Sequence, residues 1–117
     1  MSFKFEKLEI WKKAMELGED VDSIAETFPK KEIFNLTSQI RRAADSVALN
    51  ISEGSILQSD PEQKKFLGYS IRSLAEVVTC LYKAKNRNYV DSDYFKIKYD
   101  FCYHFMNMLI AYRRNFL

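Results

Sequence analysis

The stretch that decides the fold is residues 36–54, LTSQIRRAADSVALNISEG. Placed on a helix at 100° per residue, its apolar side chains gather into one stripe. We expect that stripe to face a protein core, and its members are Leu36, Ile40, Ala43, Ala44, Val47 and Ile51. Asn35 is a suitable N-cap, and Gly54 is a typical helix C-cap. The stretch therefore predicts one buried helix with defined ends.

The same helix has two polar faces, where an ordinary amphipathic helix needs one. The face opposite the core is solvated and consists of Thr37, Ser38, Arg41, Asp45 and Ser52. Between it and the core, within an arc of about 80°, runs a polar stripe of Gln39, Arg42, Ser46, Asn50 and Glu53. This stripe could form a network between helices, join a subunit interface or contact a ligand. We predict a structural role, because buried polar side chains often fix helix register in bundles.

Three further segments show helical spacing. Residues 7–27 alternate apolar positions in steps of four and three, ending before Pro29, with the seam Ile10, Ala14, Leu17, Val21, Ile24 and Phe28. Residues 60–86 begin with a capping Asp60 and Pro61, and their seam is Leu67, Ile71, Leu74, Val78 and Leu81. Asp91 or Ser92 caps a last helix that runs almost to Leu117. Because the links between the last three helices are short, the sequence predicts an all-α, up-down-up-down antiparallel four-helix bundle.

Composition limits the class of protein. A chain of 117 residues with 47% hydrophobic and 29% charged residues is long enough for one globular core, so we expect a single domain over residues 1–117. The N-terminus shows no secretory signal, and the charge-free stretch Phe101–Tyr112 is too short to span a bilayer. Cys80 and Cys102 are isolated, as small buried thiols are. These features predict a cytoplasmic protein without membrane contact.

The last helix has more apolar surface than one core requires. Its apolar side chains cover about 240° of the circumference, whereas docking on one core needs a stripe of roughly 100° or somewhat more. Four helices offer no position so central, and we therefore predict a homo-oligomer. The expected interface residues are Tyr99, Phe101, Tyr103, Met108 and Tyr112.

The sequence offers little for catalysis. The one histidine, His104, follows Asp100 by one helical turn, but no nucleophile or oxyanion site accompanies the pair. The Glu-x-x-His motif of di-metal bundles and the glycine-rich phosphate loops are absent from the sequence. We predict that the protein is not an enzyme and binds no metal or cofactor.

A basic line on the third helix suggests another function. Lys65, Arg72, Lys83 and Arg87 fall within about 60° of one another, opposite the leucine seam, and Tyr69 lies on the same face. Such a line suits a phosphate backbone, although a solvated helix face can have the same composition. Further cations that could contribute are Arg41 on the second helix and Arg113 and Arg114 at the chain end.

Several motifs together resemble a known family. They are Phe5, Leu8, Trp11 and Ala14; Phe28-Pro29 with Glu32; Gln39, Arg41-Arg42-Ala43 and Ser46; and Asn50-Ile51-Ser52-Glu53-Gly54. The chain resembles the four-helix-bundle proteins encoded in intervening sequences of bacterial 23S rRNA genes. That family includes the accessory variability determinant of diversity-generating retroelements, and its members commonly carry Ala where this chain has Ser52.

This resemblance implies a pentameric ring and an association with nucleic acid. The leading hypothesis is a non-enzymatic oligomer that binds RNA, or a ribonucleoprotein, through its basic surface; DNA is also a possible ligand. The alternative is a scaffold ring that recruits a protein such as a reverse transcriptase without touching nucleic acid.

Overall fold

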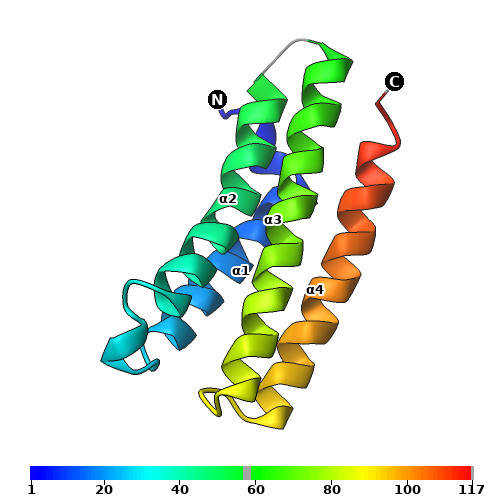
Figure 1. Ribbon diagram of the computed structural model, residues 1–117. Helices are drawn as coiled ribbons and strands as arrows, with labels where there is room; N and C mark the ends of the chain where they lie inside the picture. Colours follow the sequence, from blue (N-terminus) through cyan, green and yellow to red (C-terminus); the bar gives the residue numbers. More distant parts are fainter. Residues whose placement is uncertain (57–58, 117) are drawn as a thin grey trace.

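The computed structural model describes residues 1–56 and 59–116. Four long helices, α1 (Glu9–Ala25), α2 (Leu36–Ile56), α3 (Asp60–Asn86) and α4 (Ser92–Arg113), pack side by side in a body of 43 × 24 × 23 Å (Figure 1). Two short 3₁₀ helices, η1 (Lys4–Lys7) and η2 (Lys30–Glu32), precede α1 and α2. Successive helices pack on one another, and the two termini lie at one end of the bundle. The predicted all-α, up-down bundle is confirmed.

The helix ends follow from local hydrogen bonding. Asp91 caps α4 as predicted, since its Oδ1 accepts the Tyr94 N–H at 2.7 Å. The cap of α3 is Ser59, whose Oγ accepts the Glu62 N–H at 3.3 Å, and not the predicted Asp60, which is already helical. The helices α1 and α4 are also shorter than predicted. The predicted connection 55–59 includes residues 57 and 58, and the predicted end of α4 reaches residue 117, all outside the described residues.

The predicted seams form the core. All six apolar positions of the α2 stripe are buried, and so are five of the six seam positions of residues 7–28. In α3, Val77 is fully buried and Val78 only partly, because the helix is rotated slightly from the predicted seam. One assignment was wrong: Thr37, expected on the solvated face, is 5% exposed.

The helices pack unequally around this core. The α2–α3 pair has the most extensive contact, and the Ser70 hydroxyl of α3 donates to the Val47 carbonyl of α2 at 2.9 Å. The α1–α4 pair has the least extensive contact of the neighbouring helices, joined by an ion pair of 2.7 Å between Lys98 Nζ and Asp20 Oδ2. The α2–α3 pair is therefore the close-packed side of the bundle.

Gly54 allows the close approach of α2 and α3. It was predicted to end its helix, but α2 continues to Ile56 and no glycine has a positive φ. A Cβ added to Gly54 would lie 2.7 Å from the Phe66 Cβ of α3, well inside van der Waals contact. The glycine is needed for space between two helices, and not for a left-handed backbone.

Replacing Gly54 by alanine should therefore destabilise the protein. Alanine gains about 1 kcal/mol of helix propensity, but overpacking against Phe66 costs about 1–3 kcal/mol. We expect urea unfolding to show a net loss of up to about 2 kcal/mol. Gly18→Ala is the matched control, since its Cβ would meet only Asp45 Oδ1 at 3.7 Å, an ordinary contact. It should be neutral or stabilise by about 0.5–1 kcal/mol, and equal effects of the two variants would disprove the packing argument.

Candidate functional site

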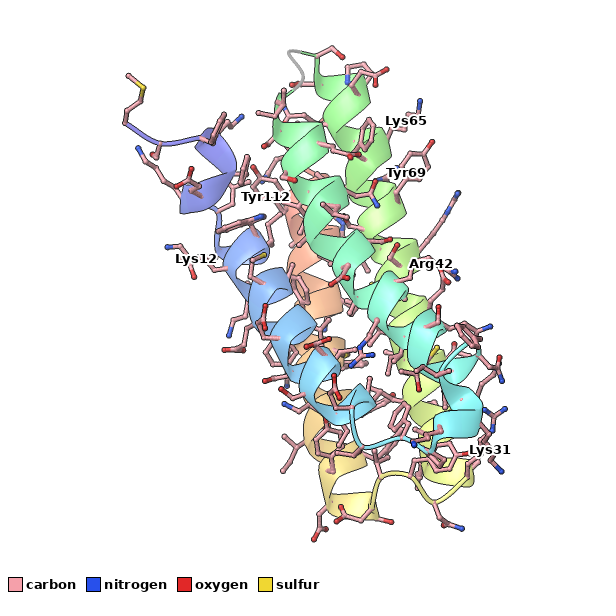
Figure 2. The ribbon with its side chains drawn as sticks, turned by 90° about the vertical axis from the view of Figure 1, so that its left-hand side faces the viewer. Lys12, Lys31, Arg42, Lys65, Tyr69 and Tyr112 are labelled. Carbon is pink, nitrogen blue, oxygen red and sulfur yellow. The ribbon has the colours of Figure 1, made fainter. Side chains whose placement is uncertain are left out.

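A groove between α2 and α3 brings together two sets of residues that the sequence left apart. Its volume is about 310 Å³. The helix α2 contributes Gln39 and Arg42 from the polar stripe, and α3 contributes Arg72 and Lys83 from the basic line. Figure 2 shows Lys65, at the start of α3, near the same edge of the bundle as Arg42. Cations from two helices therefore share one surface.

Among the described residues, the cations of this groove have no ion-pair partner. Within residues 1–56 and 59–116, no carboxylate lies within 4.0 Å of the charged nitrogens of Arg42, Arg72, Lys83 or Lys65. Glu76 is the one acidic residue that lines the groove. Because three cations face one carboxylate, the groove is positively charged and accessible to an anion.

Two cations predicted for the same surface are engaged elsewhere. Arg41 lies beside α1, with Nε 3.0 Å from Asp22 Oδ1 and Nη2 3.0 Å from Glu26 Oε1. Arg87 Nη1 lies 3.1 Å from Glu32 Oε2. Since each guanidinium is already neutralised by carboxylates of the same chain, we leave both residues out of the candidate surface.

The C-terminal arginines also lie apart from the groove. Arg113 packs over Gly68 and donates from Nε to the Lys64 carbonyl at 2.9 Å. Arg114 lines the cleft between α3 and α4 together with Arg113. These two side chains therefore belong to a different edge of the molecule.

The polar stripe of α2 does not act as one unit. The Asn50 amide donates to the Ser46 carbonyl of its own helix at 2.9 Å, whereas Gln39 and Arg42 face the groove and Glu53 is exposed. In the described part of the chain, no hydrogen bond links these five residues to another helix. A structural role for the whole stripe stays a prediction, and its Gln39–Arg42 end joins the candidate site.

A buried carboxylate network, which the sequence did not reveal, holds the end of the bundle near η2. Glu32 is 5% exposed, and its Oε2 accepts the Tyr89 hydroxyl at 2.6 Å and Arg87 Nη1 at 3.1 Å. Its Oε1 accepts the Asn35 amide at 3.1 Å and the Leu36 N–H at 3.5 Å. Asn35 directly precedes α2, and its backbone carbonyl accepts the Gln39 N–H at 2.9 Å while its side-chain amide donates to Glu32.

This network changes the acidity of its members. The hydrogen bond from Tyr89 is the main cause that lowers the pKa of Glu32, and burial opposes it. The same hydrogen bond raises the pKa of the Tyr89 hydroxyl. The sequence around Glu32 did not identify this network, because Glu32 directly follows Lys30 and Lys31 and its partners Arg87 and Tyr89 lie more than fifty residues away.

The aromatic residues predicted as an oligomer interface divide between two flanks of α4. Tyr99 and Tyr103 lie in an aromatic row with ring centroids 6.3 Å apart, and Tyr103 is 58% exposed. Met108 and Tyr112 face α1 instead and line an open cleft of about 640 Å³. The wide apolar arc is therefore partly used within the subunit, against α3 on one side and α1 on the other.

The candidate acid–base pair does not form. Asp100 Oδ2 pairs with Lys96 at 3.5 Å, and the exposed His104 ring lies edge-on to Tyr103 with centroids 6.0 Å apart. Among the described residues, no three His, Cys, Asp or Glu side chains gather as a metal site. Both cysteines are buried and free, and burial raises the pKa of Cys102 to about 11.

The family model described as 23S rRNA-intervening sequence protein matches residues 6–111, from η1 to the last turns of α4. The chain belongs to this family. The resemblance seen in the sequence is thereby confirmed over α1, α2, α3 and most of α4. No curated protein matches the chain in sequence. In the described ranges, no helix has the length and apolar character needed to cross a bilayer.

The Glu32 network predicts a stability that depends on pH. The pKa of Glu32 is lowered in the folded protein. The network therefore stabilises the fold fully when the pH is above the ordinary glutamate pKa of about 4.3, and this stabilisation is lost as the pH falls through the folded pKa. Glu32→Gln should therefore lower Tm by several degrees at neutral pH, and the gap from the native protein should narrow near pH 3. Thermal unfolding followed by circular dichroism measures this gap. A gap of constant size would show that ionisation is irrelevant, and exposed Glu16→Gln is the control.

Proposed function

We propose that this protein is a non-enzymatic, oligomeric bundle that binds nucleic acid, foremost RNA, through the α2–α3 groove. The observation that carries the proposal is the meeting of Arg42, Arg72 and Lys83 in one groove without ion-pair partners among the described residues. Membership of the 23S rRNA-intervening sequence protein family supports a link to RNA biology.

The dimensions and chemistry of the surface suit a polyanion. From Lys65 to Lys83 the basic line extends about 27 Å along α3, since each residue rises about 1.5 Å. Affinity along such a line comes mainly from the release of counterions, which gives weak sequence preference and strong salt dependence. Tyr69 lies on the same line, T-shaped against Phe66 at 5.5 Å, and offers a partly exposed ring to a base.

Assembly would strengthen this binding, because a basic groove repeated in several subunits creates a larger field. The open α1–α4 cleft supports a homo-oligomer, since Met108 and Tyr112 leave apolar surface there that a second subunit could cover. A pentamer is the subunit number that the family resemblance suggests.

The binding proposal predicts the effect of charge reversal. Arg72→Glu with Lys83→Glu should reduce affinity for a fluorescein-labelled RNA hairpin about tenfold or more at low salt, and should lower the slope of log affinity against log salt by about two. Fluorescence anisotropy at several salt concentrations measures both quantities. The matched control is Lys12→Glu with Lys96→Glu, which reverses two exposed cations away from the groove.

Two results would overturn the proposal. One is no RNA binding by the native protein at low salt, and the other is an equal loss in the control. Either result would favour the scaffold alternative, in which the same groove recruits a protein such as a reverse transcriptase.

If the protein is a homo-oligomer as proposed, light scattering of dilute protein should give a mass several times the 13.8 kDa of one chain. Met108→Asp should lower that mass while helix content is kept, because a charge in the apolar cleft opposes burial by a neighbouring subunit. Tyr103→Asp is the comparison on the opposite flank of α4, where a tyrosine can remain exposed with its hydroxyl in water. A native protein that stays monomeric at all concentrations would disprove the oligomer.

A further inference from the structure

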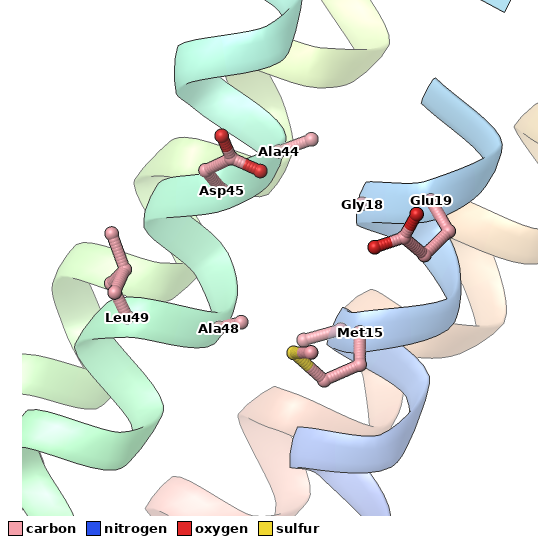
Figure 3. A pocket seen from close by; sticks show the side chains of 8 residues that line it. Met15, Gly18, Glu19, Ala44, Asp45, Ala48 and Leu49 are labelled. Carbon is pink, nitrogen blue, oxygen red and sulfur yellow. The ribbon is translucent and has the colours of Figure 1, made fainter. Parts of the chain in front are cut away.

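A second groove lies between α1 and α2 and has the opposite charge. Its volume is about 290 Å³, and small side chains line much of it: Ala14, Gly18, Ala44 and Ala48. Figure 3 shows Glu19 of α1 and Asp45 of α2 on opposite sides of the groove, and one turn further along Met15 of α1 lies across from Ala48 of α2. The groove therefore has an acidic part and an apolar part in succession.

In the part of the chain that the structure describes, the apolar part of the groove is left exposed and the acidic part is left without a cation. Met15 is 42% exposed and Leu49 57%, and the aliphatic Leu49 side chain has no polar atom to hydrate. Within residues 1–56 and 59–116, no cation lies within ion-pair distance of Glu19 or Asp45. The nearby acidic groups Asp22 and Glu26, by contrast, each have an oxygen 3.0 Å from a nitrogen of the Arg41 guanidinium.

We propose that this α1–α2 groove binds a basic amphipathic helix of a partner protein. Gly18 of α1 and Ala48 of α2 are partly exposed beside the buried Ala14 and Ala44, so no bulky side chain fills the groove at that level and a third helix can approach there. Basic side chains of that helix pair with the two free carboxylates, and its leucines or similar residues cover the exposed Met15 and Leu49.

The charge of the groove selects this partner. Carboxylates repel phosphate, so nucleic acid is excluded from the α1–α2 groove and is left to the α2–α3 groove. An acidic helix is disfavoured for the same reason. The two grooves lie on either side of α2, so one subunit can hold RNA and a basic partner together.

A labelled peptide tests the proposal on the intact protein. The probe is a fluorescein-labelled 14-residue amphipathic helix of leucine and lysine, and its counterpart has glutamate in place of lysine. We expect saturable anisotropy binding of the lysine peptide. Asp45→Lys should weaken it about tenfold, whereas Glu16→Lys, an equal charge change on the outward face of α1, should leave affinity within about twofold. Any binding of the glutamate peptide belongs to the basic α2–α3 groove and should not be weakened by Asp45→Lys. No binding of the lysine peptide would overturn the proposal, as would equal effects of the two variants on it.

A steric variant tests the shape of the groove independently of its charge. Gly18→Leu fills the space between the helices without adding charge, and it should also weaken the lysine peptide about tenfold. Gly18→Ala adds one methyl group in ordinary contact with Asp45 and should bind almost as the native protein does. Both variants should keep the native mass and RNA affinity, so failure here is distinct from failure of the RNA proposal. A lower mass for Gly18→Leu would instead assign the groove to a second copy of this chain and overturn the proposal.

Discussion

The close approach of α2 and α3 is the constraint on which the rest of the structure depends. Gly54 lets the α2 backbone come near Phe66, and the buried Ser70 hydroxyl ties the two helices through the Val47 carbonyl. Because this pair is fixed in register, Arg42 of α2 stands beside the basic residues of α3. A wider separation would leave two unrelated lines of charge in place of one groove.

The fold decides which charged side chains form ion pairs and which line the grooves. Arg41 and Arg42 are adjacent in sequence, yet the first pairs with Asp22 and Glu26, whereas the second lines the α2–α3 groove with no ion-pair partner among the described residues. Arg87 is likewise held by Glu32 at the end of the bundle. Among the described residues, the charged side chains that line the α2–α3 groove are Arg42, Arg72 and Lys83 with one carboxylate, Glu76, whereas those that line the α1–α2 groove are both acidic, Glu19 and Asp45.

Residue chemistry alone predicted part of the candidate site. Arg72 and Lys83 were identified from helical spacing, because residues on one helix keep their relative angles in any fold. Arg42 was assigned to a structural stripe, since its neighbour Arg72 lies thirty residues away on another helix. Gly54 was assigned to a helix end for a similar reason: glycine suits both a C-cap and a close helix contact, and only the position of Phe66 decides between them.

The sequence by itself determined the helices, their buried faces and the all-α bundle, because these depend on the local period of apolar residues and on caps such as Asp91. It also determined the family, through motifs spread over most of the chain. Only the tertiary structure decided which cations remain free, how Glu32 is satisfied, and where grooves open between helices. Those features depend on pairs of residues far apart in the chain, whose distance is set by helix packing and not by any local pattern.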